Sequence, residues 1–169
     1  ENLATLIRKQ FEELKPLPEG LHRRASGLLR EYMLVGGMPK VVATYIEKRD
    51  FSVADQEKRQ ILTLYRNDVA RFARGYEFKV VSVLDNIPGQ LSKREKKFTL
   101  ASLDKNARMR DYEEAFFWLA DARISNICYA STDPIVVLSL NKEYRSLKSY
   151  MADTGLLVTL AFADKNITD

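Results

Sequence analysis

The amino-acid sequence predicts a mainly α-helical protein, with a helical bundle over residues 1–75 and a winged helix-turn-helix with a small β wing over residues 76–169. Apolar side chains recur at steps of three and four residues through most of the first 122 positions, which is the period of one helix face. Glycines and prolines interrupt this pattern at intervals suited to short helices. From position 124 the pattern changes to short runs rich in Ile, Val and Tyr, which indicate strands.

Four helices are expected before Gly75. The first ends at the Pro- and Gly-containing stretch 16–20 and the second at Gly36 and Gly37, because these residue types end helices. Pro39 suits the first turn of the third helix, and the fourth is expected to run from near Ser52 to about residue 74. The apolar positions that define them are Leu3, Leu6, Ile7, Phe11 and Leu14; Ala25, Leu28, Leu29, Tyr32 and Met33; Val42, Tyr45 and Ile46; and Ile61, Leu62, Tyr65, Val69 and Phe72.

A three-helix unit and short strands are expected after Gly75. Pro88 is expected to kink or close the first of these helices, and Thr99 to cap a short second helix. The third carries an apolar face from Tyr112 to Ala122. The remaining expected elements are strands at 124–131, 135–140 and 146–151, with turns at Asp133–Pro134 and Asn141, and a last helix capped by Asp153 or Thr154.

Composition excludes several classes of function. With one cysteine, Cys128, and one histidine, His22, the 169-residue chain can form no intrachain disulfide and offers no zinc cluster or Cys/His catalytic pair. A reducing, cytoplasmic location is therefore expected. The longest apolar run is far shorter than the roughly 18 residues of a membrane span, so no membrane partner is expected. The chain opens inside a helical pattern without an initiator methionine, so we expect it to be a fragment of a longer protein.

Five stretches carry a resemblance to a known family. They are LREYMLVGGMPKVVATYI, ILTLYRNDVARF, VLDNIPGQLSKREKKFTLASL, MRDYEEAFFWLADARI and KSYMADTGLL. Together they resemble a family of predicted prokaryotic AAA+ ATPases, in which a P-loop ATPase core precedes a helical lid and a winged-helix-like domain of unknown function. The resemblance implies that residues 1–75 are lid-like, that the ATPase core is a missing N-terminal partner, and that any nuclease-like region would follow Asp169.

The parts of the sequence that would hydrolyse ATP are absent. Neither a GxxxxGK[ST] motif nor an apolar strand ending in paired acidic residues occurs, so no catalytic residue is expected and the fragment should not be an enzyme alone. ATP and magnesium would be ligands of the full-length protein only. In that setting the resemblance implies that Gly36, Gly37, Met38 and Pro39 pack near the adenine ring and that Arg66 senses the terminal phosphate.

A simpler interpretation of these residues stays open. Two glycines that end one helix, followed by a proline that begins the next, form a common helix connection. Similarly, Arg66 belongs to an arginine-rich helix in which Asp68 and Arg71 have the spacing of a surface ion pair.

A basic segment precedes and enters the third helix of the second half. Its candidate nucleic-acid contacts are Lys93, Arg94, Lys96, Lys97, Arg108 and Arg110. Further along the same helix, Asp111 and Glu114 repel phosphates, which argues against base readout by that helix. The alternative is a packing module in which Phe117 and Trp118 face a protein partner.

Three functional hypotheses follow. The first is a regulatory, non-catalytic portion of an AAA+ protein that couples nucleotide state to partner or nucleic-acid contacts. The second is a freestanding winged-helix module that binds double-stranded DNA, and the third is a protein-interaction domain without a nucleotide role. The sequence does not indicate an oligomeric state.

Overall fold

A computed structural model describes residues 2–95, 97–133 and 141–162. Within them the protein is mainly helical, with a small two-stranded antiparallel sheet, as the sequence predicts. The elements are α1 (Leu3–Glu12), α2 (Glu19–Val35), α3 (Pro39–Lys48), α4 (Phe51–Phe72), α5 (Glu77–Ser92), the 3-10 turn η1 (Leu100–Ser102), α6 (Met109–Asp121), β1 (Ser125–Ser131), β2 (Lys142–Met151) and α7 (Thr154–Ala161).

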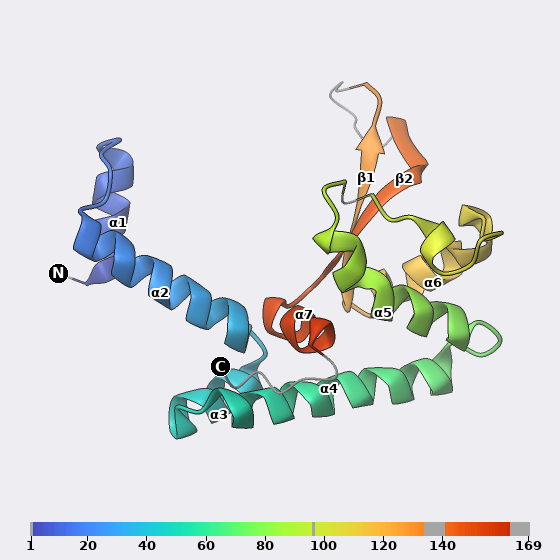
Figure 1. Ribbon diagram of the computed structural model, residues 1–169, viewed down its shortest axis with the longest axis horizontal. Helices are drawn as coiled ribbons and strands as arrows, with labels where there is room; N and C mark the ends of the chain where they lie inside the picture. The colour runs from blue at the N-terminus through green and yellow to red at the C-terminus, as the bar shows by residue number, and fades with distance from the viewer. Residues whose placement is uncertain (1, 96, 134–140, 163–169) are drawn as a thin grey trace.

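Helices α1 and α2 form an arm that extends from the rest of the molecule (Figure 1). No residue of α1 is buried, although its apolar side chains have helical spacing. The apolar stripe of α2 is also largely open, with exposed fractions of 46% to 58% at Leu28, Leu29, Tyr32 and Met33. Helical periodicity therefore identifies these two helices correctly without telling whether their apolar faces are covered.

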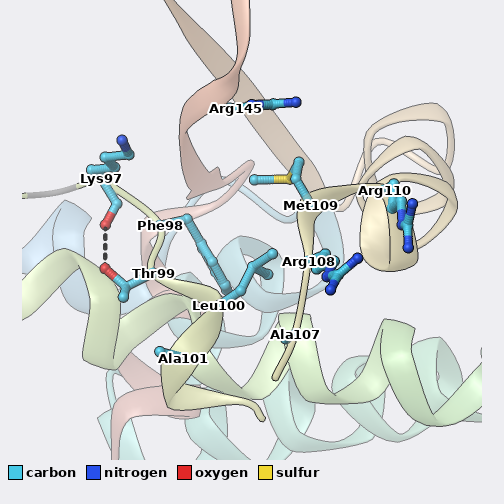
Figure 2. Close-up of a pocket in the computed structure, with 10 residues that line it drawn as sticks. All are labelled: Lys97, Phe98, Thr99, Leu100, Ala101, Ala107, Arg108, Met109, Arg110 and Arg145. Atoms are coloured by element: carbon cyan, nitrogen blue, oxygen red, sulfur yellow. Dashed lines mark hydrogen bonds between the residues drawn. The ribbon is translucent and has the colours of Figure 1, made fainter. Parts of the chain in front are cut away.

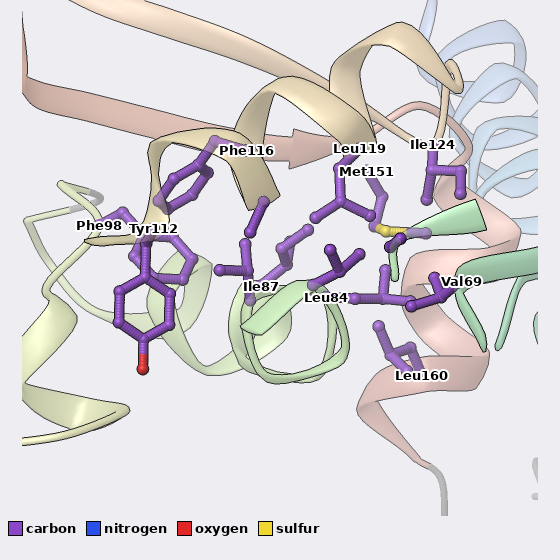
Figure 3. Packing of buried hydrophobic residues seen from close by; sticks show 14 of the residues in the cluster. Val69, Leu84, Ile87, Phe98, Tyr112, Phe116, Leu119, Ile124, Met151 and Leu160 are labelled. Atoms are coloured by element: carbon purple, nitrogen blue, oxygen red, sulfur yellow. The ribbon is translucent and has the colours of Figure 1, made fainter. Parts of the chain in front are cut away.

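The main hydrophobic core crosses position 75. Leu62, Val69 and Ala73, in and after α4, are buried together with residues of α5, α6, β2 and α7. Figure 3 shows Val69 and Leu160 at one end of this core and Phe98 and Tyr112 at the other. A smaller core joins α2, α3 and the start of α4 and consists of Val35, Val41, Tyr45 and Ala54. Because α4 serves both cores, it connects the two halves of the chain.

Helix α5 does not close at Pro88, which lies inside it. Ile87, directly before the proline, and Gln90, two residues after it, are buried, and this packing stabilises the last turn despite the lost backbone donor. The Gln90 side chain accepts a hydrogen bond from the Thr99 backbone N–H (3.1 Å) and donates one to the Thr99 carbonyl (3.2 Å). Gln90 thereby fixes the loop after α5. Thr99 does not cap η1 with its side chain, contrary to the prediction.

The sheet pairs β1 with β2 in antiparallel register from Ser125 opposite Met151 to Tyr129 opposite Leu147. The register then jumps, so that Ala130 pairs with Glu143 and three residues of β2 bulge out. The strands predicted at 124–131 and 146–151 fall on β1 and β2, whereas the one at 135–140 lies outside the described residues. Cys128 is exposed, because alternate residues of β1 point away from the core.

Candidate nucleic-acid interface

A shallow cavity of about 600 Å³ lies where the loop after α5, the start of α6 and β2 meet. Its apolar centre contains Phe98 and Leu100, and cationic side chains surround it in Figure 2. The ten lining residues are Lys97, Phe98, Thr99, Leu100, Ala101, Ala107, Arg108, Met109, Arg110 and Arg145. Four of them are cations and none is a carboxylate, so the lining favours an anionic ligand.

The position of Lys97 follows from a buried anchor beside it. Phe98 is 3% exposed, its backbone N–H donates to the Leu147 carbonyl (2.8 Å), and its ring meets that of Phe116 edge to face at 5.0 Å. These contacts tie the loop after α5 both to β2 and to α6. Lys97 itself is exposed, so its ammonium group is available at the edge of the cavity.

Arg108 and Arg110 flank the first residue of α6. The helix is held against the core by Tyr112 and Phe116, which fixes where it begins. Asp111 is a neighbour of both arginines: its carboxylate accepts a hydrogen bond from the Arg108 backbone N–H (3.3 Å) and lies 3.6 Å from the Arg110 guanidinium. Both members of the Arg110–Asp111 pair are well exposed, so the pair is weak and solvent-screened.

Arg145 reaches the cavity because of the bulge in β2. It is one of the three residues, 144 to 146, that lie between the Leu147 and Glu143 pairings. A bulge changes the direction of side chains relative to a regular strand. The sequence prediction missed Arg145, because strand alternation alone cannot reveal a register shift and no local pattern indicates one.

A second, smaller hollow of about 180 Å³ adjoins the cationic cavity and shares Met109, Arg110 and Arg145 with it. Its other lining residues are Glu113, Phe116, Tyr129, Tyr144 and Leu147. The Tyr129 and Tyr144 rings lie 5.3 Å apart at 59°. Burial, followed by the nearby Glu113 carboxylate, raises the pKa of Tyr129. We call this hollow the tyrosine pocket.

The other predicted nucleic-acid contacts lie elsewhere. Lys93 and Arg94 are exposed on the turn that follows α5 and do not line the cavity. The Lys93 ammonium group donates a hydrogen bond to the Gln90 side chain (3.2 Å). Lys96 lies outside the described residues. The structure thus brings together Lys97, Arg108 and Arg110 of the six predicted residues and adds Arg145.

The predicted nucleotide-binding turn, Gly36 to Pro39, contacts the start of α7. The Gly37 N–H donates to the Asp153 carboxylate (2.6 Å), which also caps α7 by accepting from the Leu156 N–H (2.8 Å). Gly36 has φ of 82°, and a Cβ there would overlap that carboxylate. Met38 packs against both cores and Pro39 begins α3. The turn therefore has a packing role in this chain, while its role toward a nucleotide stays a prediction.

Arg66 lies at the edge of the buried face of α4, one turn after Leu62, and is half-exposed. Its guanidinium donates two hydrogen bonds to the Asp85 carboxylate of α5, at 2.7 and 3.1 Å. Both side chains are about 40% exposed. This pair joins the two helices at the surface, and the proposed phosphate-sensing role of Arg66 stays a prediction.

A buried charged cluster joins α4 to α7, and the sequence analysis did not predict it. It consists of Asp55, Lys58, Arg59 and Thr159. Asp55 accepts hydrogen bonds from the Thr159 hydroxyl (2.5 Å) and from Arg59 (2.8 Å). The Lys58 ammonium group lies 3.5 Å from Asp55 and donates to the Leu34 carbonyl at 2.7 Å. Burial lowers the pKa of Lys58. Burial alone would raise the pKa of Asp55, but its hydrogen bonds and the nearby cations hold it below the ordinary value.

Two further properties concern only the described part of the chain. There, no group of three or more His, Cys, Asp or Glu side chains is arranged to hold a metal ion. None of the helices in that part combines the length and apolar character needed to cross a membrane.

The fold and the cavity together define a mainly helical protein with a small hairpin and a cationic surface site. The chain belongs to the family described as Domain of unknown function (DUF8612), whose family model matches residues 26–166. Neither the search of curated proteins nor that of solved structures finds a match. The family match includes every residue that lines the cationic cavity and the tyrosine pocket.

Proposed function

We propose that the protein binds the phosphate backbone of nucleic acid through its cationic cavity. The observation that carries this proposal is the meeting of Lys97, Arg108, Arg110 and Arg145, from three separate segments, around a hollow whose lining contains no carboxylate. Lysine and arginine side chains neutralise phosphates and release the counterions condensed on nucleic acid. On this proposal, α5, η1, α6 and the hairpin act as a winged-helix-like unit.

The charges along α6 restrict how such a unit would bind. The cations lie at its beginning, whereas Glu113, Glu114 and Asp121 are exposed further along. These carboxylates line another hollow, beside Phe117, that shares Arg110 with the cationic cavity. Carboxylates repel phosphates, so insertion of the whole helix into a major groove is disfavoured. We therefore assign backbone contacts to the start of α6 and the hairpin, without base readout by α6.

The test is fluorescence anisotropy of labelled DNA, titrated with the protein at several salt concentrations. We expect binding that weakens as salt increases and that is strongly reduced in the Arg108→Ala/Arg145→Ala variant. The matched control is Arg8→Ala/Arg24→Ala, which removes the same charge from the α1–α2 arm. Equal losses in the two variants would show that net charge, and not the cavity, attracts the DNA.

We further propose, on the resemblance to AAA+ proteins, that the fragment is a non-catalytic regulatory portion of an ATP-binding protein. The supporting observation is that Asp153 connects the Gly36–Pro39 turn to α7, which in turn packs on α5 and β2. A change at the turn could thus reach the elements that carry the cavity. The test is ATP turnover by the full-length protein: Arg66→Ala should lower it, and unchanged turnover would remove the sensor role.

A further inference from the structure

The cationic cavity and the tyrosine pocket adjoin, because Met109, Arg110 and Arg145 line both. Their chemistry differs. The larger one has four cations and no carboxylate, whereas the smaller one offers two tyrosine rings and the Glu113 carboxylate. A ligand that fills both therefore has an anionic part next to a flat, apolar part.

The tyrosine pocket is less favourable to phosphate than the cationic cavity, since the Glu113 carboxylate offsets part of the charge of Arg110 and Arg145. Its exposed ring, Tyr144, is 57% accessible and stands beside the half-buried Tyr129. Aromatic rings offer a stacking surface to any nucleobase. A carboxylate also accepts hydrogen bonds from the exocyclic amino groups of bases, as Glu and Asp do with cytosine.

The bulge in β2 accounts for this arrangement. Tyr144 and Arg145 are adjacent in the bulge, so an aromatic ring and a guanidinium face the same region from neighbouring positions. In a nucleic acid, a base and its phosphate are likewise separated by one sugar. The adjacent ring and cation thus offer one contact to a base and one to the phosphate of the same nucleotide.

We infer that the tyrosine pocket receives an unpaired base, and that the partner is single-stranded nucleic acid. This inference rests on the proposed phosphate-binding role of the cationic cavity. In a duplex both faces of a base are covered by stacking, and exposing one costs a few kcal/mol for unstacking and unpairing. An unpaired strand presents its bases to Tyr144 without that cost.

The experiment compares short labelled DNA and RNA strands with a DNA duplex of the same sequence, using the intact chain. Tyr144→Leu should weaken binding of the single strands by roughly 5-fold or more, the low end of one stacking contact. Tyr144→Phe keeps the ring and should bind like the wild type. The matched control is Tyr150→Leu, since Tyr150 is an exposed tyrosine of the same strand that lines neither hollow.

The outcomes separate the inference from the proposed function. If single strands bind more tightly than the duplex and only Tyr144→Leu weakens them, the inference is supported. If duplex and single strands bind equally and Tyr144→Leu changes neither, while Arg108→Ala/Arg145→Ala weakens both, the base pocket is refuted and the phosphate site stands. If no form binds even at low salt, both are refuted. The DNA and RNA strands show which sugar the site accepts.

Discussion

Two regions of the molecule gather charged side chains, and they do so in opposite ways. In the buried charged cluster, Asp55 and Lys58 are 6% and 3% exposed at their side chains and lie within 3.5 Å of each other. In the cationic cavity, four cations share an open surface whose lining holds no carboxylate. The first arrangement satisfies its charges internally, whereas the second leaves a net positive field directed outward.

This difference separates a structural from a functional use of charge. A buried ion must be paired and hydrogen-bonded, because leaving it without a partner costs several kcal/mol. Its removal should therefore affect folding. Exposed cations contribute little to stability, since solvent and salt screen them. Their removal should affect binding and leave the fold intact, and the following predictions test this contrast.

The largest loss in the free energy of unfolding is expected for Lys58→Ala. The substitution leaves the Asp55 carboxylate with fewer partners in a buried site and deprives the Leu34 carbonyl of its donor. Breaking a buried pair in this way costs about 3–5 kcal/mol, which urea-induced unfolding would measure. Lys9→Ala, on the exposed α1, is the control and should change the free energy of unfolding by less than about 0.5 kcal/mol. A loss equally small at Lys58 would contradict a structural role for the cluster.

Gly155→Ala should destabilise the junction between α2 and α7 by about 2–3 kcal/mol. A Cβ at this position would overlap the Val35 carbonyl group and the Gly36 nitrogen, which are backbone atoms and cannot rotate away. Thermal unfolding would show the loss. Gly27→Ala is a matched control in α2, where a Cβ has open space and the added methyl should favour the helix. Similar behaviour of the two variants would argue against close contact at the junction.

Acidification should remove the contribution of Asp55 to the stability of the fold. The pKa of Asp55 in the folded protein lies below the ordinary value, so its ionised form stabilises the fold. This stabilisation is fully present above the unfolded-state pKa of about 3.9. It is lost as the pH falls through the folded-state pKa. Asp55→Asn should therefore be less stable than the wild type at neutral pH, with the gap narrowing in acid. Urea-induced unfolding at a series of pH values measures the difference in free energy of unfolding between Asp55→Asn and the wild type. A difference that stays constant with pH would contradict a stabilising role for the ionised Asp55.

The smallest loss in the free energy of unfolding is expected for Arg66→Ala. The Arg66–Asp85 pair is bidentate but about 40% exposed, so its loss should lower the free energy of unfolding by at most about 1 kcal/mol. A loss comparable to that of Lys58→Ala would mean that the surface pair, and not only the buried cluster, holds the halves together.

The helices were predictable from sequence because their signals are local. Apolar spacing located the helices before Gly75, and Asp153 was a predicted cap of the last helix, which the Leu156 N–H confirms. Pro88 does not close its helix, because burial of Ile87 and Gln90 outweighs the lost backbone donor. The exposed stripe of α2 likewise shows that periodicity predicts a helix and not its burial.

The candidate site was only partly predictable. Lys97, Arg108 and Arg110 belong to a basic segment that is evident in the sequence. Arg145 depends on a bulge, which no local pattern indicates. The hydrogen bond between Asp55 and Thr159 joins residues 104 positions apart, so the buried charged cluster emerges only when α7 packs on α4.

The salt dependence of nucleic-acid binding tests the central claim most directly. Each phosphate contact adds about 0.7 to 0.9 to the slope of the logarithm of the binding constant against the logarithm of salt concentration. We predict that Arg108→Ala/Arg145→Ala lowers the magnitude of this slope by roughly 1.5, the value for two phosphate contacts. The thermal unfolding of this variant should match that of the wild type. An unchanged slope in a folded variant would contradict the assignment of the cationic cavity as the phosphate-binding surface.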